Sequence, residues 1–140
     1  HLAYAKLLLA KNNSEEAISY LTSIISLSPR NIPLTLFYSE VELNYGSAEK
    51  AHENLLDLFN NVAPSPTQIK LIARAANASG EYAESFSYMG EYYLSLGMFN
   101  EAIEQIKIAL TIDSITNIQI AKFVARLNEI EEYLENTNKR

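Results

Sequence analysis

The sequence predicts an all-α fold, an antiparallel helix-turn-helix α-solenoid of about eight helices with a long C-terminal capping helix. No segment alternates apolar and polar residues with the period of two that is typical of a strand. Residues that suit the end of a helix recur at Asn12, Gly46 and Gly80, 34 residues apart, and such a period is typical of stacked helical hairpins. Another break follows half a period later at Gly97, so the register of the pairs stays open past residue 80.

Length and composition predict a single domain over residues 1–140. The hydrophobic fraction of 48% is enough for a buried core. The 17 acidic and 11 basic residues give a net charge of -6, which opposes binding to the phosphates of nucleic acids. The lack of cysteine excludes disulfides, thiolate nucleophiles and zinc-thiolate sites. No apolar run approaches the roughly 20 residues of a membrane span.

The first two helices are predicted over residues 2–11 and 14–28. Asn12 lies between them, and asparagine tolerates the left-handed conformation that closes a helix. Glu15 and Glu16 follow in the first turn of the second helix, where the helix dipole favours acidic groups. The two ranges therefore form the first antiparallel pair.

The second pair is predicted over residues 32–45 and 47–61. Pro29 ends the first pair, and Gly46 separates the helices of the second because glycine readily adopts the left-handed conformation. Ser47 is a favourable residue for starting the next helix.

The third pair is predicted over residues 66–79 and 81–96, separated by Gly80. Pro66 suits the first helical position, and Ser65 with Gln68 forms a capping-box pattern that satisfies two backbone N–H groups.

The last two helices are predicted over residues 99–112 and 115–137. One side of the final helix carries an apolar stripe that is expected to pack against the preceding helices. The stripe consists of Ile120, Phe123, Leu127, Ile130 and Leu134. Its polar face consists of Glu129, Glu131, Glu132 and Glu135. Because the end of a helical repeat array needs a polar outer face, we interpret this helix as a cap, although its acidic face could instead recruit a basic partner.

These helices group into units of about 1–31, 32–65 and 66–99, an overlapping fourth unit of 83–116, and the capping helix. Small residues recur at one position in each helix of a pair. They are Ala5, Ala17, Ser39, Ala51, Ala73, Gly90 and Ala102. We predict that paired helices approach closely at these positions, where a larger side chain would separate them.

The period and these residues resemble the tetratricopeptide repeat family. The fourth unit fits best, and the first and second are weaker but in register. The fourth unit carries Phe86, Met89-Gly90, Tyr93, Gly97, Ala102 and Ile106 at the signature spacing. The third unit departs from the pattern because Ser85 stands where alanine is usual. The resemblance implies a noncatalytic protein–protein interaction module.

A closer resemblance covers roughly residues 66–138. The run from Glu91 to Ile103 and the long helix with Ala125-Arg126 resemble the C-terminal repeat region of the beta-barrel assembly-enhancing protease family, which are bacterial periplasmic zinc metallopeptidases. This resemblance implies a fragment of a longer protein, located in the periplasm and active in outer-membrane protein assembly and quality control. Its partners would be the assembly machinery or unfolded outer-membrane proteins.

No catalytic, cofactor or metal site is predicted in the chain itself. His52-Glu53 begins like a zinc-peptidase motif, but Leu56 occupies the position of the second histidine. The only other histidine is His1, so three zinc ligands cannot be assembled, and we expect His52 to be an exposed surface residue. The chain has no Gly-x-Ser-x-Gly elbow, and its four glycines are too scattered for a phosphate loop.

The expected binding site is the groove lined by the first helix of each pair. The positions expected to face it are Lys6, Leu9, Phe37, Glu40, Asn44, Lys70, Arg74 and Asn77. Lys70 and Arg74 are four residues apart, so they share a helix face and could hold a carboxylate. The alternative for this pair is an ordinary solvated surface.

Tyr88 and Tyr92 lie off the packing stripe of their helix and are expected to be exposed, as interface anchors or as structural residues. A rival to peptide binding is a stand-alone scaffold that self-associates through its apolar end.

Overall fold

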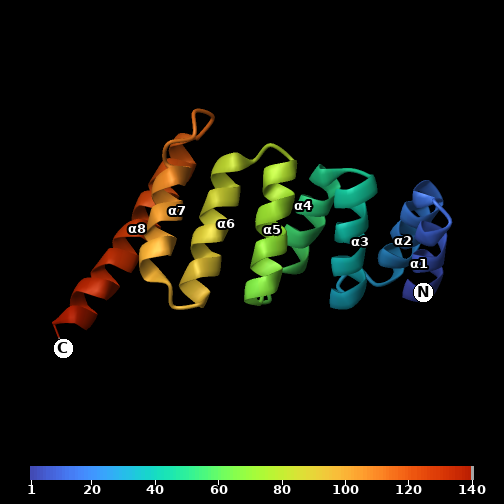
Figure 1. Cartoon of the computed structure of the whole chain (residues 1–140), viewed down its shortest axis with the longest axis horizontal. Coiled ribbons are helices and arrows are strands. Elements are labelled where there is room, and N and C mark those ends of the chain that lie inside the picture. The colour runs from blue at the N-terminus through green and yellow to red at the C-terminus, as the bar shows by residue number, and fades with distance from the viewer. Residues whose placement is uncertain (140) are drawn as a thin grey trace. The chain divides into compact units, whose positions relative to one another are not determined.

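The computed structural model describes residues 1–139, which form eight helices and no strand (Figure 1). The all-α prediction is confirmed, and each predicted helix ends within three residues of the observed one. The helices are α1 (Leu2–Ala10), α2 (Ser14–Leu27), α3 (Ile32–Tyr45), α4 (Ala48–Leu58), α5 (Pro66–Ala78), α6 (Tyr82–Ser95), α7 (Phe99–Ala109) and α8 (Asn117–Asn138). The chain divides into two compact units, His1–Ala63 and Pro64–Arg140. None of the helices in the described part is long and apolar enough to cross a membrane.

The first unit contains α1 to α4, each packed against the next helix in the chain. Its core consists of Ala5, Leu21, Leu34, Tyr38 and Val41. The small residues that were predicted to lie between paired helices are fully buried here. They are Ala5, Ala17, Ser39 and Ala51. Close approach of the helices therefore explains the recurrence of small side chains in this unit.

A buried glutamate joins α3 to the start of α4. Glu42 is 2% exposed, and its Oε1 accepts a hydrogen bond from the Tyr38 hydroxyl at 2.7 Å. Its Oε2 accepts a bond from the backbone N–H of Ser47 at 2.6 Å. Burial raises the pKa of the Tyr38 hydroxyl above its ordinary value, and the neighbouring Glu42 raises it further. Tyr38 therefore stays protonated and acts as a donor to Glu42.

The left-handed conformation predicted for the helix breaks occurs at Asn12 (φ 58°), Gly80 (φ 85°) and Gly97 (φ 74°). The prediction is wrong for Gly46, whose φ is -133°. A Cβ atom at this position would lie 2.2 Å from Oε2 of Glu42 and 3.0 Å from Cδ1 of Ile18. Glycine is thus required at residue 46 because the buried carboxyl group approaches the backbone.

We expect Gly46→Ala to lower the free energy of unfolding by about 1–3 kcal/mol, the usual cost of overpacking a filled site. Urea denaturation followed by circular dichroism measures this loss. In a Glu42→Ala background, the same substitution should cost less than about 0.5 kcal/mol, because the atom that it meets is gone. An equal cost in both backgrounds would show that the Glu42 contact does not determine residue 46.

The second unit contains α5 to α8, and α6 packs against both α5 and α7. At the α6–α7 contact, a Cβ atom on Gly90 would lie 2.8 Å from Cγ1 of Ile106, so only glycine fits without a shift. At the α5–α6 contact, the buried Ser85 hydroxyl donates a 2.8 Å hydrogen bond to the carbonyl oxygen of Ala73. This bond gives serine a role where the repeat pattern has alanine.

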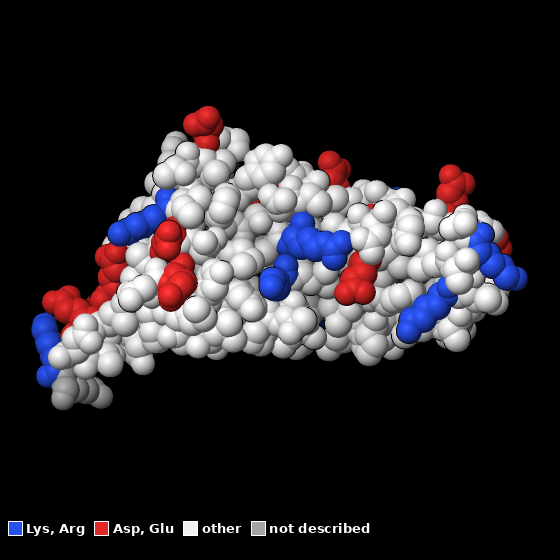
Figure 2. Space-filling view, viewed as in Figure 1, with Lys and Arg blue, Asp and Glu red and all other residues white. Residues whose placement is uncertain are grey.

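Helix α8 presents its predicted apolar stripe to this unit. Phe123 and Ile130 are buried, Leu127 is half-buried, and Ile120 lies at the more exposed end of the stripe. The four glutamates of its polar face are exposed, and Figure 2 shows acidic side chains gathered along this helix. Thr116 and Gln119 form a capping box at its start, with backbone-to-side-chain bonds of 2.9 and 3.2 Å. The interpretation of α8 as a helix with one buried and one polar face is confirmed.

Candidate functional site

Helices α6 and α8 are joined by polar contacts between residues 35 positions apart. Nε2 of Gln119 donates to Oε1 of Glu84 at 3.1 Å, and Arg126 forms two hydrogen bonds with Glu91. The separation is about one repeat, so α6 and α8 occupy equivalent positions in successive helix pairs. These contacts do not distinguish the first helix of a pair from the second, and the register of the pairs past residue 80 stays a prediction.

Arg126 is held in one orientation by carboxylates from both helices. Its Nε lies 2.7 Å from Oε1 of Glu91, and its Nη2 lies 2.9 Å from Oε2 of the same residue. Its Nη1 lies 2.9 Å from Oε2 of Glu129 on its own helix. The hydrogen bonds with Glu91 raise the pKa of the guanidinium above its ordinary value, although partial burial opposes them. Bidentate pairing of this kind fixes geometry as well as charge.

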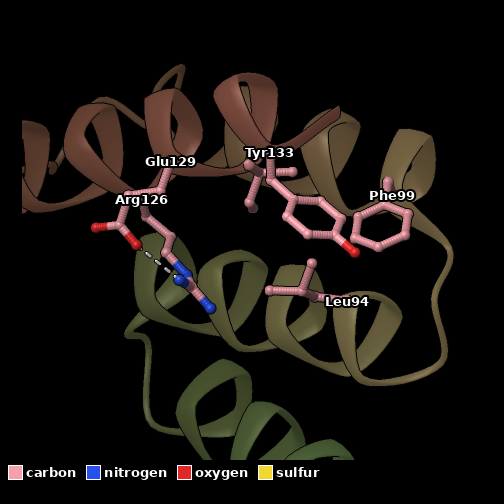
Figure 3. A pocket seen from close by; sticks show the side chains of 6 residues that line it. Leu94, Phe99, Arg126, Glu129 and Tyr133 are labelled. Atoms are coloured by element: carbon pink, nitrogen blue, oxygen red, sulfur yellow. Dashed lines mark hydrogen bonds and ion pairs between the residues drawn. The ribbon is translucent and has the colours of Figure 1, made fainter. Parts of the chain in front are cut away.

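Two cavities share Arg126 and Glu129 as walls. The first, of about 320 Å³, is drawn in Figure 3. Its remaining lining is apolar or aromatic and consists of Leu94, Phe99, Ile130 and Tyr133. The second, of about 330 Å³, is more polar, and its remaining lining consists of Ser87, Glu91, Lys122, Phe123 and Ala125. We call the surface formed by these eleven residues the α6–α8 groove.

An aromatic pair forms the far wall of the apolar cavity. The rings of Phe99 and Tyr133 stack with their centroids 5.3 Å apart and an interplanar angle of 29°. Tyr133 is 56% exposed, so its ring is available to a ligand as well as to Phe99. Figure 3 shows Tyr133 and Arg126 projecting from α8 toward Leu94 on α6. Stacked aromatic rings beside a polar group suit the binding of one large side chain.

In the first unit, the structure brings two of the predicted groove residues together. Nζ of Lys6 on α1 lies 5.6 Å from the ring centroid of Phe37 on α3. Lys6 is exposed and Phe37 is half-buried. Glu40 and Asn44 are also exposed on α3. Their assignment to a binding groove stays a prediction.

In the second unit, the predicted residues Lys70, Arg74 and Asn77 are all exposed on α5. Nζ of Lys70 lies 5.4 Å from the ring centroid of Tyr92 on α6, a cation–π distance. Lys70 thus has a neighbour within its own unit. Whether it holds a carboxylate together with Arg74 stays a prediction.

Three exposures expected from the sequence are wrong. Tyr88 and Tyr92 are half-buried, because α6 is covered by α5 and α7 and bonded to α8. Burial raises the pKa of Tyr88 to about 12, and the charge of Glu84 adds to the shift. His52 is buried on α4 instead of exposed. Among the described residues, no three His, Asp or Glu side chains come together as possible metal ligands.

None of the site residues predicted from the sequence lies in the α6–α8 groove. The signal that would have found it is the recurrence of complementary polar residues at one-repeat spacing, the opposite charges of Glu91 and Arg126 and the hydrogen-bonding pair of Glu84 and Gln119.

Residues 1–31 match the tetratricopeptide repeat family, over the part of the chain that forms α1 and α2. No curated protein sequence matches the chain. Among solved structures, one crystal structure of a protein named MamA is 16% identical, covers 94% of this chain and 96% of that one, and has a TM-score of 0.47. A second MamA structure is 17% identical, covers 96% and 82%, and has a TM-score of 0.47. The first helix pair thus has a tetratricopeptide repeat sequence, and such repeats generally serve as scaffolds for protein interactions.

Proposed function

We propose that the chain is a noncatalytic protein–protein interaction module that binds a segment of a partner protein in the α6–α8 groove. The observation that carries the proposal is the apolar cavity between Leu94, Phe99, Ile130 and Tyr133, which opens directly beside a fixed arginine. Binding sites in proteins commonly combine an apolar pocket with a few fixed polar groups. The volume of about 320 Å³ suits one or two side chains of a peptide.

The charged groups of the groove are arranged for binding. Arg126 is kept charged and immobile by Glu91 and Glu129, and Lys122 lies 3.8 Å from Glu84. Ion pairs within the chain hold these side chains in fixed positions, so the charges that face a ligand are already arranged before it binds. This arrangement supports a recognition role for the groove.

A finer proposal concerns the parent protein. The sequence resemblance over residues 66–138 supports a tetratricopeptide tail of a periplasmic zinc metallopeptidase that acts in outer-membrane protein assembly, and this stretch includes the whole groove. Reading the gene upstream of His1 tests this proposal. A His-Glu-x-x-His helix encoded there is expected, and an unrelated upstream domain would contradict it.

We expect Tyr133→Ala to weaken peptide binding by about tenfold or more, because exposed aromatic anchors dominate such interfaces. Twelve-residue peptides selected on the wild-type chain from a random library provide the ligands, and fluorescence anisotropy gives the dissociation constants. Tyr45→Ala is the matched control, because Tyr45 is exposed to a similar degree (58%) on α3 and should have no effect.

Two further outcomes would contradict the groove assignment. Binding that survives Tyr133→Ala but is lost in the Lys70→Glu/Arg74→Glu variant would move the site to α5. Light scattering that shows a dimer dispersed by Tyr133→Ala would favour the self-associating scaffold.

A further inference from the structure

We infer that the segment bound in the α6–α8 groove carries a large apolar side chain and, two residues away, a lysine or arginine. This inference rests on the proposed function and specifies the chemistry of the partner. Its basis is the balance of charge in the groove, the pairing of Arg126 with two carboxylates and the spacing of Glu129 and Tyr133 on α8.

The charges in and beside the groove leave an excess of one negative charge. The three carboxylates are Glu84, Glu91 and Glu129, and the two cations are Lys122 and Arg126. The chain as a whole carries a net charge of -6, and Glu131, Glu132 and Glu135 are exposed on the same helix. Both the local and the overall field therefore attract a basic segment.

Arg126 is a poor partner for a carboxylate of the ligand, because two carboxylates already offset its charge. Both oxygens of Glu91 bind its Nε and Nη2, and Glu129 binds its Nη1. An incoming carboxylate that approached the remaining N–H groups would be repelled by Glu91 and Glu129. The Glu129 side chain, by contrast, is 64% exposed and contacts Arg126 through Oε2, so a ligand cation can approach it from solvent.

The spacing of the two anchor points defines the ligand pattern. Glu129 and Tyr133 are four residues apart on α8, so they lie on one helix face with Cβ atoms about 5–6 Å apart. In an extended peptide, residues i and i+2 point to the same side and lie about 6–7 Å apart. An apolar side chain in the cavity beside Tyr133 therefore places the side chain two residues away next to Glu129.

Three synthetic peptides test the inference, each labelled with a fluorophore and measured by anisotropy in low salt. The first has the sequence Gly-Ser-Gly-Phe-Ser-Lys-Gly-Ser-Gly; the second replaces Lys with Glu, and the third replaces Phe with Ala. We expect the first to bind the wild-type chain about fivefold more tightly than either of the others, with a preference that shrinks as salt is added.

Two variants of α8 provide the matched comparison. Glu129→Gln should remove most of the preference for Lys over Glu in the peptide. Glu135→Gln removes the same charge from an exposed residue that pairs with Lys139, and it should leave the preference unchanged.

The outcomes separate this inference from the proposed function. If the Lys and Glu peptides bind equally and Tyr133→Ala weakens both, the groove stands and the basic specificity is overturned. If no Phe peptide shows binding that depends on Tyr133, both fall. If Glu129→Gln and Glu135→Gln reduce the preference for Lys equally, the preference comes from the net charge of the whole chain. That result overturns the assignment to Glu129.

Discussion

Replacing Phe123 with alanine is expected to lower the free energy of unfolding of the C-terminal unit by about 3–5 kcal/mol, the usual cost of truncating a buried phenylalanine. Phe123 is 1% exposed and belongs to the core cluster with Ala83, Ile106, Ala109 and Ile130. It also lines the polar cavity of the α6–α8 groove. Truncation should therefore loosen α8 and open the groove.

Urea denaturation and hydrogen exchange of the α8 amides measure this effect. Val124→Ala is the control, because Val124 is the next residue on α8 and is 39% exposed, and it should cost less than about 1 kcal/mol. Similar losses for the two variants would show that α8 does not pack through the face assigned to it.

Glu42→Ala is expected to cost about 2–4 kcal/mol. The substitution removes the acceptor of two donors, the buried Tyr38 hydroxyl and the half-buried Ser47 backbone N–H, and a buried donor without a partner costs about 1–3 kcal/mol. It also leaves a space between α3 and the start of α4. Glu40→Ala changes an exposed glutamate of the same helix and should be nearly neutral.

A double variant distinguishes two contributions to this loss of stability: the Tyr38 hydroxyl left without an acceptor and the space left by the Glu42 side chain. Adding Tyr38→Phe to Glu42→Ala removes one stranded donor and should restore about 1 kcal/mol relative to Glu42→Ala alone. Urea denaturation of the four chains gives the coupling. Strictly additive losses would contradict the role of Tyr38 as the donor to Glu42.

The helices, and the positions where paired helices approach closely, were predictable from patterns in the sequence. The 34-residue recurrence, the capping box of Ser65 and Gln68, and the small residue at Ala102 each depend on neighbours in sequence or on one repeated contact. Such signals survive in a single sequence because they repeat. The apolar stripe of α8 was predictable for the same reason, since its period alone defines the buried face.

Features that depend on one tertiary contact were not predictable. Gly46 ends α3 as predicted, but a glycine is needed there because the buried Glu42 carboxyl group approaches its backbone, and not because of a left-handed conformation. His52, Tyr88 and Tyr92 were misjudged because their exposure depends on how neighbouring helices cover them. The sequence pattern predicts which face of a helix is buried, but it does not predict how far a neighbouring helix covers the residues beside that face.

The α6–α8 groove was not predictable because its polar contacts join two helices that are not consecutive in the chain. Glu91 on α6 and Arg126 on α8 are 35 residues apart and form two hydrogen bonds. Each of them is an ordinary surface charge in the pattern of its own helix, so the sequence favoured Lys70 and Arg74, which share one face of α5.

Mapping a selected peptide by NMR tests the groove most directly. On addition of the peptide to the isotope-labelled chain, the largest shifts in backbone amide signals are expected at Leu94, Phe99, Arg126 and Tyr133. Shifts centred on Lys70 and Arg74 of α5, or on Lys6 and Phe37 in the first unit, would contradict binding between α6 and α8.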